Sequence, residues 1–146
     1  MPHFGHMDEG KMTRQDAELM RARLHLRAAR RRFLQGRIGT GVSVLFDAFI
    51  SSIRWYALSP GLSLDLNPGD DPNDERALFY ALVRSGILDG RPDYDGFNAV
   101  MEDAVEGRLK DLDYTEMLRD VEYAMTRLGV MPFDLRGLPP EAPDAP

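Results

Sequence analysis

The sequence predicts a single all-α domain, an antiparallel bundle of about five helices. A stretch of twenty-two mostly apolar residues, 37–58, has its polar side chains on one side only. Four further segments place apolar residues at helical spacing, and short segments rich in glycine or proline separate several of them. Residues 13–136 should form the bundle, with a flexible N-terminus over 1–12 and a proline-rich flexible tail over 137–146.

The first helix is expected to begin after Thr13 and to end at Gly36. Thr13 suits an N-cap, and Asp16 stands at the N3 position of a capping box. Glycine is the preferred residue just beyond a helix, because it adopts a left-handed conformation without strain. The apolar positions that should face the core are Leu19, Ala22, Leu26, Ala29 and Phe33.

The apolar stretch predicts a central second helix over 38–58. Three glycines, at 36, 39 and 41, indicate a tight junction before it, and Thr40 is a candidate N-cap. Pro60 and Gly61 should end it. Its apolar face would consist of Val42, Leu45, Phe46, Phe49, Ile53, Tyr56 and Ala57.

The rest of the chain predicts a loop and three shorter helices. Alternating leucines at 62, 64 and 66 allow a short extended piece within the loop 59–72. Asn73 or Asp74 should cap a third helix that ends around 86–90, and a fourth should run over roughly 93–108. Asp113 should cap a fifth helix, which Gly129 closes.

Composition limits the classes of protein to which this chain can belong. The net charge is −6, with +5 in residues 1–60 and −11 in residues 61–146. Because the chain has no cysteine, thiolate chemistry is excluded, and a cytoplasmic location is expected. We expect no membrane-spanning helix, because the apolar stretch carries Asp47 and Arg54. The N-terminus also lacks the features of a secretory signal.

Asp47, Ser51 and Arg54 form a polar stripe on the second helix, spaced i, i+4 and i+7. One interpretation is a binding groove in which Arg54 holds an anion, Ser51 donates a hydrogen bond and Asp47 orients Arg54. The other is a structural ion pair between Arg54 and Asp47, or an acid of a neighbouring helix. Trp55 falls at the margin of the apolar face and should lie at the groove or at a dimer contact.

Arginines cluster on the first helix, where Arg23, Arg27, Arg30 and Arg31 would lie around its outer side. Clustered cations can follow a phosphate backbone, so nucleic-acid binding is one interpretation. The alternative is a solvated face that also pairs with the acidic C-terminal half of the chain, and the charge split favours it.

The sequence predicts neither a metal site nor a cofactor. No Glu-x-x-His pair occurs, so the carboxylate-bridged di-iron pattern of helical bundles is missing. The loop 67–74 shares only its composition with calcium-binding loops. His25 has no carboxylate at helical spacing, so it is expected to be structural rather than a ligand.

The order of elements resembles the HEPN superfamily of helical bundles, which includes partner domains of nucleotidyltransferases and many ribonucleases. The resemblance covers residues 17–58, with Ala-x-x-x-Phe-x-x-Gly from Ala29 to Gly36, then Leu-Phe-Asp-Ala over 45–48. It implies a homodimer and a possible nucleotidyltransferase partner. The catalytic signature of that superfamily, Arg followed by four to six residues and His, is missing, because only three residues separate Arg21 from His25. The resemblance therefore implies its non-catalytic branch.

These observations favour a non-enzymatic interaction or ligand-binding module, with a groove formed by Asp47, Ser51, Arg54 and Trp55. Two alternatives stay open. The first is a nuclease or a nucleotidyltransferase-accessory enzyme component, with Asp47 as the general base. The second is a nucleic-acid binder that uses the arginine-rich first helix.

Overall fold

The computed structural model describes residues 12–60, 62, 64–109 and 111–141. Its elements are the helices α1 (Arg14–Leu34), α2 (Ile38–Ala57), α3 (Glu75–Arg84), α4 (Tyr94–Val105) and α5 (Tyr114–Leu128), and the short 3-10 helix η2 (Leu135–Gly137). No strand occurs within these ranges, at Leu62, Leu64 and Leu66 included, so the predicted all-α bundle is confirmed.

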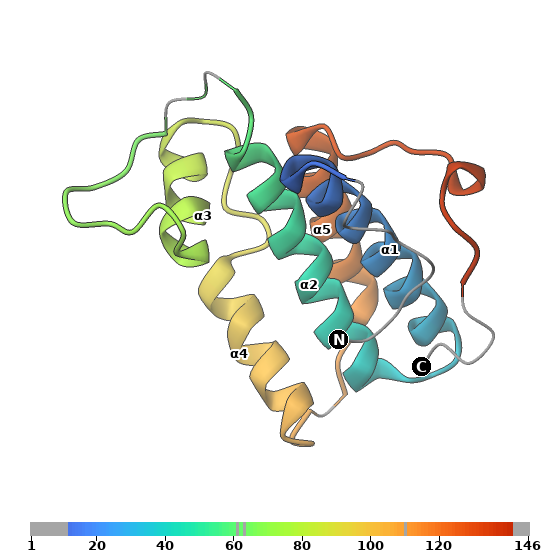
Figure 1. Cartoon of the computed structure of the whole chain (residues 1–146). Helices are drawn as coiled ribbons and strands as arrows, with labels where there is room; N and C mark the ends of the chain where they lie inside the picture. Colours follow the sequence, from blue (N-terminus) through green and yellow to red (C-terminus); the bar gives the residue numbers. More distant parts are fainter. Residues whose placement is uncertain (1–11, 61, 63, 110, 142–146) are drawn as a thin grey trace.

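Helix α2 lies at the centre of the bundle. Figure 1 shows α1 and α5 on one side of it and α3 and α4 on the other. Its side chains are buried on most of its surface, including Val44, Ala48 and Ile50, which lie off the predicted apolar face. A helix that is apolar nearly all round can be stable only when neighbours cover every side. The prediction of a central second helix is confirmed.

The aromatic core joins α2 to its neighbours. Phe49 of α2 contacts Phe79 of α3 and Phe97 of α4, with ring centroids 5.8 and 5.7 Å apart. Phe46 meets Phe97 edge to face at 5.1 Å. Tilted and edge-to-face contacts of this kind add specificity to the burial of large apolar rings. They fix α3 and α4 against the same side of α2.

Local capping accounts for most helix boundaries. The side chains of Thr13, Asp74, Asp93 and Asp113 each accept a backbone N–H at the start of a helix, as N-caps do. Gly129, with φ of 91°, ends α5 in the left-handed conformation. The predicted boundaries are therefore confirmed to within a few residues.

Thr40 is not the N-cap of α2, so that prediction is wrong. Arg37 takes the N-cap position, without a side-chain hydrogen bond, and the Thr40 hydroxyl donates to the Arg37 carbonyl at 3.3 Å. The junction is shorter than expected, because Gln35 caps the end of α1 and the Arg37 N–H already bonds to the Arg32 carbonyl. Thr40 consequently lies inside the first turn of α2.

The segment after α5 packs along α1. The Arg27 guanidinium donates to the Pro139 carbonyl at 2.7 Å and pairs with Glu141, and Leu138 packs against the core. Pro139 and Glu141 belong to the segment for which the sequence predicts a flexible tail, and that flexibility stays a prediction. Residues 1–11 and 142–146, where the flexible ends were also expected, lie outside the described residues. No described helix combines the length and the apolar character needed to cross a membrane.

Candidate functional site

Arg54 lies near the C-terminal end of α2 and is paired with α3. Its Nη2 atom is 2.6 Å from Oε1 of Glu75, the first residue of α3. The other carboxylate oxygen of Glu75 accepts a hydrogen bond from the Tyr94 hydroxyl at 3.4 Å. Glu75 therefore links three helices. This contact agrees with the second interpretation of Arg54, a structural ion pair with an acid of a neighbouring helix.

Asp47 does not orient Arg54, so that part of the expected groove is wrong. Within the described part of the chain, Asp47 makes no ion pair with Arg54. Asp47 is exposed, on the side of α2 near Glu75. The pKa of Asp47 is raised to about 6, mainly by partial loss of hydration and also by the nearby Glu75 charge, while Arg32 opposes the shift.

Ser51 and Trp55 have different neighbours from Arg54. Ser51 is buried, 7% exposed, and its hydroxyl makes no hydrogen bond to any described residue. Trp55 is half-buried, and its ring lies beside Gly129 at the end of α5. The Trp55 carbonyl accepts from Nε2 of Gln15 on α1 at 3.4 Å. Asp47, Ser51 and Trp55 do not belong to the described lining of the pocket beside Arg54.

Arg54 nevertheless lines a pocket, which has a volume of about 440 Å³. The pocket lies where the end of α2 meets the starts of α1 and α3. Its walls are Arg14, Arg54, Ala57, Leu58, Pro72, Asn73 and Leu78. Among the described residues of this lining, two arginines and one asparagine have polar side chains, and none has a carboxylate. Such a lining suits a small anion with an apolar part.

Arg14 was not predicted as a site residue. It is exposed at the first position of α1, and it makes no hydrogen bond or ion pair with the described residues. Arg54 uses one nitrogen for Glu75, which leaves the rest of its guanidinium donors for a ligand. The sequence contains no signal for this pairing, because forty residues separate the two arginines.

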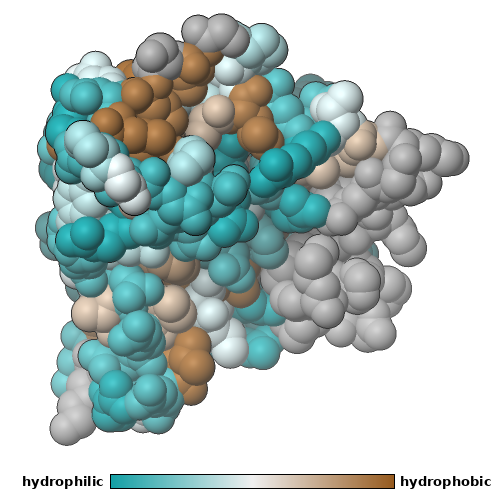
Figure 2. All heavy atoms as spheres, turned by 60° about the vertical axis from the view of Figure 1, so that its left-hand side comes forward, coloured by the Kyte–Doolittle hydropathy of each residue, from teal (hydrophilic) through white to brown (hydrophobic). Residues whose placement is uncertain are grey.

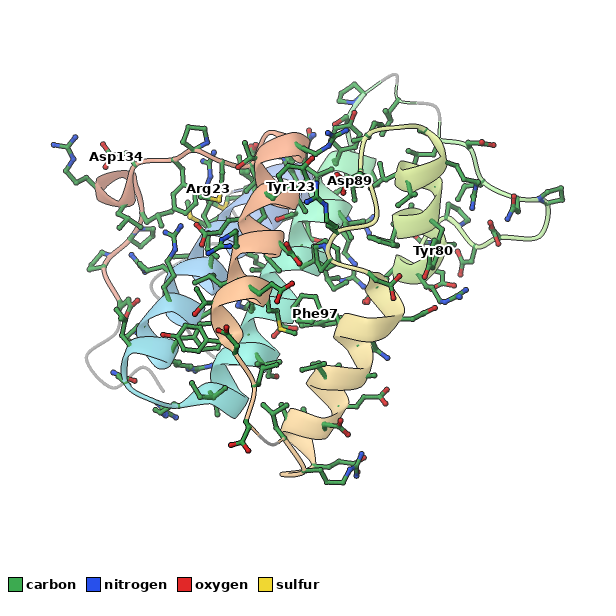
Figure 3. All side chains as sticks on the ribbon, turned by 180° about the vertical axis from the view of Figure 1, so that it is seen from behind. Arg23, Tyr80, Asp89, Phe97, Tyr123 and Asp134 are labelled. Carbon is green, nitrogen blue, oxygen red and sulfur yellow. The ribbon has the colours of Figure 1, made fainter. Side chains whose placement is uncertain are left out.

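The arginines on the outer side of α1 are engaged within the molecule. Arg23 donates through two nitrogens to the Val130 carbonyl, at 3.1 and 3.2 Å, and stacks over Phe133. Arg30 pairs with Glu122 at 2.6 Å, and both Arg27 and Arg31 pair with Glu141. These contacts match the interpretation in which the basic helix pairs with the acidic C-terminal half. Figure 3 shows Arg23 between α1 and the end of α5.

The described residues contain no cluster of side chains that indicates a metal centre. No set of three or more His, Asp or Glu side chains is arranged to hold a metal ion within the described ranges. His25 is buried beside Arg21 and Arg32, and burial lowers its pKa to about 4, with the two arginines adding to the shift. An imidazole in these surroundings is neutral near pH 7, as a structural histidine would be.

Comparison of the chain with protein-family models, with curated proteins and with solved structures gives no match.

Proposed function

We propose that this chain is a non-catalytic helical binding module whose pocket holds an anionic group between Arg14 and Arg54. The observation that supports the proposal most is the pocket of about 440 Å³, whose described lining residues include two arginines and no acidic residue. The apolar wall formed by Ala57, Leu58 and Leu78 favours a ligand whose anionic head carries a short hydrocarbon part.

The electrostatics of the pocket also favour an anion. Arg14 occupies the first position of α1, where the exposed N–H groups of the helix attract negative charge. Asn73 adds an amide from the loop that leads into α3. A phosphate or carboxylate could accept from both arginines, since guanidinium groups offer paired donors to such oxygens.

Titration with butyl phosphate, followed by amide NMR shifts of the full chain, tests this proposal. Inorganic phosphate and butanol separate the contributions of the charged head and of the hydrocarbon part. We expect butyl phosphate to shift the amides of Leu58 and Asn73 more than either control does. Arg14→Gln should abolish saturation without altering the fold, since Arg14 has no partner among the described residues.

Two further variants make this result specific. Arg54→Gln should also weaken binding, although it breaks the pair with Glu75 as well. Arg108→Gln is the matched control, because it removes one exposed arginine at the end of α4 that pairs with Asp103. Equal binding to the wild-type chain, Arg14→Gln and Arg108→Gln would rule out the arginine pocket.

The proposal includes a homodimer, on the basis of the helix order that resembles the HEPN superfamily. Light scattering after size exclusion, at low and at high salt, measures the mass of the particle. A dimer that persists at high salt would support an apolar interface, since screening weakens contacts between exposed charges. A monomer at both salt concentrations would remove the dimer from the proposal while leaving the pocket to be tested separately.

A further inference from the structure

Helix α4 is the least buried of the longer helices. Phe97 is its one buried residue within the described chain, and the side chain of Val105 is 67% exposed. Val100 and Met101 are only partly covered. Figure 2 shows a largely hydrophilic surface with separate hydrophobic areas, one of them at the lower end of the molecule, the level of the C-terminal end of α4 in Figure 1. The apolar side of α4 is therefore incompletely packed.

A groove runs between α4 and α5, which both pack against α2. It has a volume of about 250 Å³. Its apolar floor consists of Pro92, Phe97, Val100, Leu112 and Met117. Figure 3 places Phe97 between the two helices when the molecule is seen from behind. A groove between two helices with an apolar floor is the geometry that receives one face of an amphipathic helix.

The rim of this groove is acidic. Asp93, Asp113, Glu116 and Asp120 line it, and the described residues of this lining include no arginine or lysine. Asp93 and Asp113 are also N-caps, which explains their presence. Glu116 and Asp120 have no such role, because neither makes a hydrogen bond or an ion pair with any described residue. They stand one turn apart on the same face of α5, and Met117 lies beside them.

We infer that the groove between α4 and α5 binds an amphipathic helix of a partner protein, one with an apolar ridge flanked by lysine or arginine. The ridge would cover Val100 and Met117, and the flanking cations would meet Glu116 and Asp120. Complementary charge around an apolar centre gives such contacts their specificity and speeds association. The described lining of this groove shares no residue with that of the arginine pocket, so an experiment can reject one binding site without rejecting the other.

A second copy of this chain does not fit the groove. The outer arginines of α1, namely Arg23, Arg27 and Arg30, are held by Val130, Glu141 and Glu122. A symmetric contact through the groove itself would place one acidic rim against another, and like charges brought together oppose association. The partner must therefore contribute the cations.

A fluorescent model peptide of leucine and lysine, about 16 residues long and amphipathic as a helix, is the probe for this site. Its binding to the full chain is measured by anisotropy at two salt concentrations. The same peptide with glutamate in place of lysine, and a scrambled leucine–lysine peptide, are the controls. We expect saturable binding of the amphipathic lysine peptide that weakens with salt, and much weaker binding of both controls.

Two pairs of substitutions locate the binding site on the protein. Glu116→Gln with Asp120→Asn should raise Kd about tenfold, because two exposed charge pairs are lost. Glu102→Gln with Glu106→Gln removes the same charge from two exposed positions outside the groove, one in α4 and one at its C-cap, and should leave Kd within about twofold. Met117→Gln should weaken binding at high salt too, where the apolar contribution dominates.

Three results would overturn the inference. The first is equal binding of the scrambled peptide, which would mean attraction by net charge alone. The second is an equal loss in both pairs of substitutions, which would place the peptide elsewhere. The third is a protein that does not bind the peptide but binds calcium through Glu116 and Asp120, which would identify the rim as a cation site.

Discussion

The 2.6 Å ion pair between Arg54 and Glu75 joins the end of α2 to the start of α3. It places a carboxylate near Asp47, and it leaves Arg54 at the edge of the arginine pocket. One residue, Glu75, therefore influences both groups of the stripe that the sequence singled out. The pair is partly exposed, with 42% of the Arg54 side chain and 30% of the Glu75 side chain accessible, so its own contribution to stability is small.

Substitution of Glu75 by Gln should lower the pKa of Asp47. Because the Glu75 charge is one cause of the raised pKa of about 6, its removal makes the Asp47 carboxylate easier to form. The pKa should stay above the ordinary value of 3.8, since loss of hydration, the largest cause, remains. Carboxyl carbon shifts of Asp47, followed by NMR from pH 3 to 8, measure the change. An unchanged pKa would show that the Glu75 charge does not reach Asp47.

Helix boundaries could be predicted because capping is local. Asp113 and Gly129 enclose α5 through contacts within a few residues, so the pattern of side chains along the chain suffices. The centrality of α2 could be predicted for a similar reason, since its own composition requires cover on every side. The cap at Thr40 failed because the number of residues in the junction after α1, which the sequence does not determine, decides where α2 begins.

The candidate site could be predicted only in part. Arg54 was identified from the sequence, but its partner was not. Asp47 stands seven residues earlier on the same helix, which is about 10 Å away along the helix axis. The path of the loop 59–74 decides which acid reaches Arg54, and that path depends on the packing of α3. Arg14 joins the pocket for the same reason, through the arrangement of α1 and α3 around the end of α2.

Nucleic acid should bind weakly to the intact chain. The outer arginines of α1 already contact carbonyl or carboxylate oxygens of the C-terminal part, so phosphates would have to displace those partners. We expect no saturable binding of single-stranded RNA or duplex DNA in filter binding at about 50 mM salt. Tight binding with a steep salt slope would instead restore the nucleic-acid interpretation.

The double variant Glu122→Gln with Glu141→Gln should increase nucleic-acid binding. Both substitutions remove carboxylates that pair with Arg27, Arg30 and Arg31, and the net charge becomes less negative by two. The same charge change at Glu102 and Glu106 is the matched control. Equal affinities of the two double variants for RNA would show that the pairing does not mask the arginines.

His25 should make the protein less stable in mild acid. Its pKa is about 4 in the native state and 6.5 as a model value for the unfolded chain. Both states are neutral above pH 6.5, so its contribution is fully present there. As the pH falls from 6.5 toward 4, only the unfolded state gains a proton, and about 3 kcal/mol of stability is lost. In His25→Gln, the urea midpoint of unfolding should depend less on pH over this range.

Asp47 has the opposite effect on stability in acid, so it provides the control for the experiment on His25. Its raised pKa means that the native state binds a proton between pH 6 and 4 more readily than the unfolded state does. Stability therefore rises through Asp47 as the pH falls, which offsets part of the loss at His25. Asp47→Asn should make the acid-induced loss steeper. A shallower loss in Asp47→Asn would contradict the assigned direction of its pKa.

Gly41→Ala should destabilise the bundle by about 1–3 kcal/mol, the range for overpacking of a core. A Cβ atom at Gly41 would lie 2.5 and 2.6 Å from ring carbons of Phe33. That ring stacks on Tyr114 with centroids 4.3 Å apart and planes 9° apart, so it cannot move aside without losing the stack. The approach of α1 to α2 at this point therefore depends on glycine.

Gly39→Ala is the matched control, two residues earlier in the same helix. Its Cβ would meet only the Ala104 carbonyl oxygen, at 3.7 Å, which is an ordinary contact. Alanine should stabilise α2 there by up to about 1 kcal/mol through its higher helix propensity. The double variant Phe33→Leu with Gly41→Ala should lose less stability than the two single losses combined, because the smaller side chain makes room for the methyl group. Equal urea midpoints for Gly39→Ala and Gly41→Ala would mean that the contact with Phe33 does not limit how closely the helices pack.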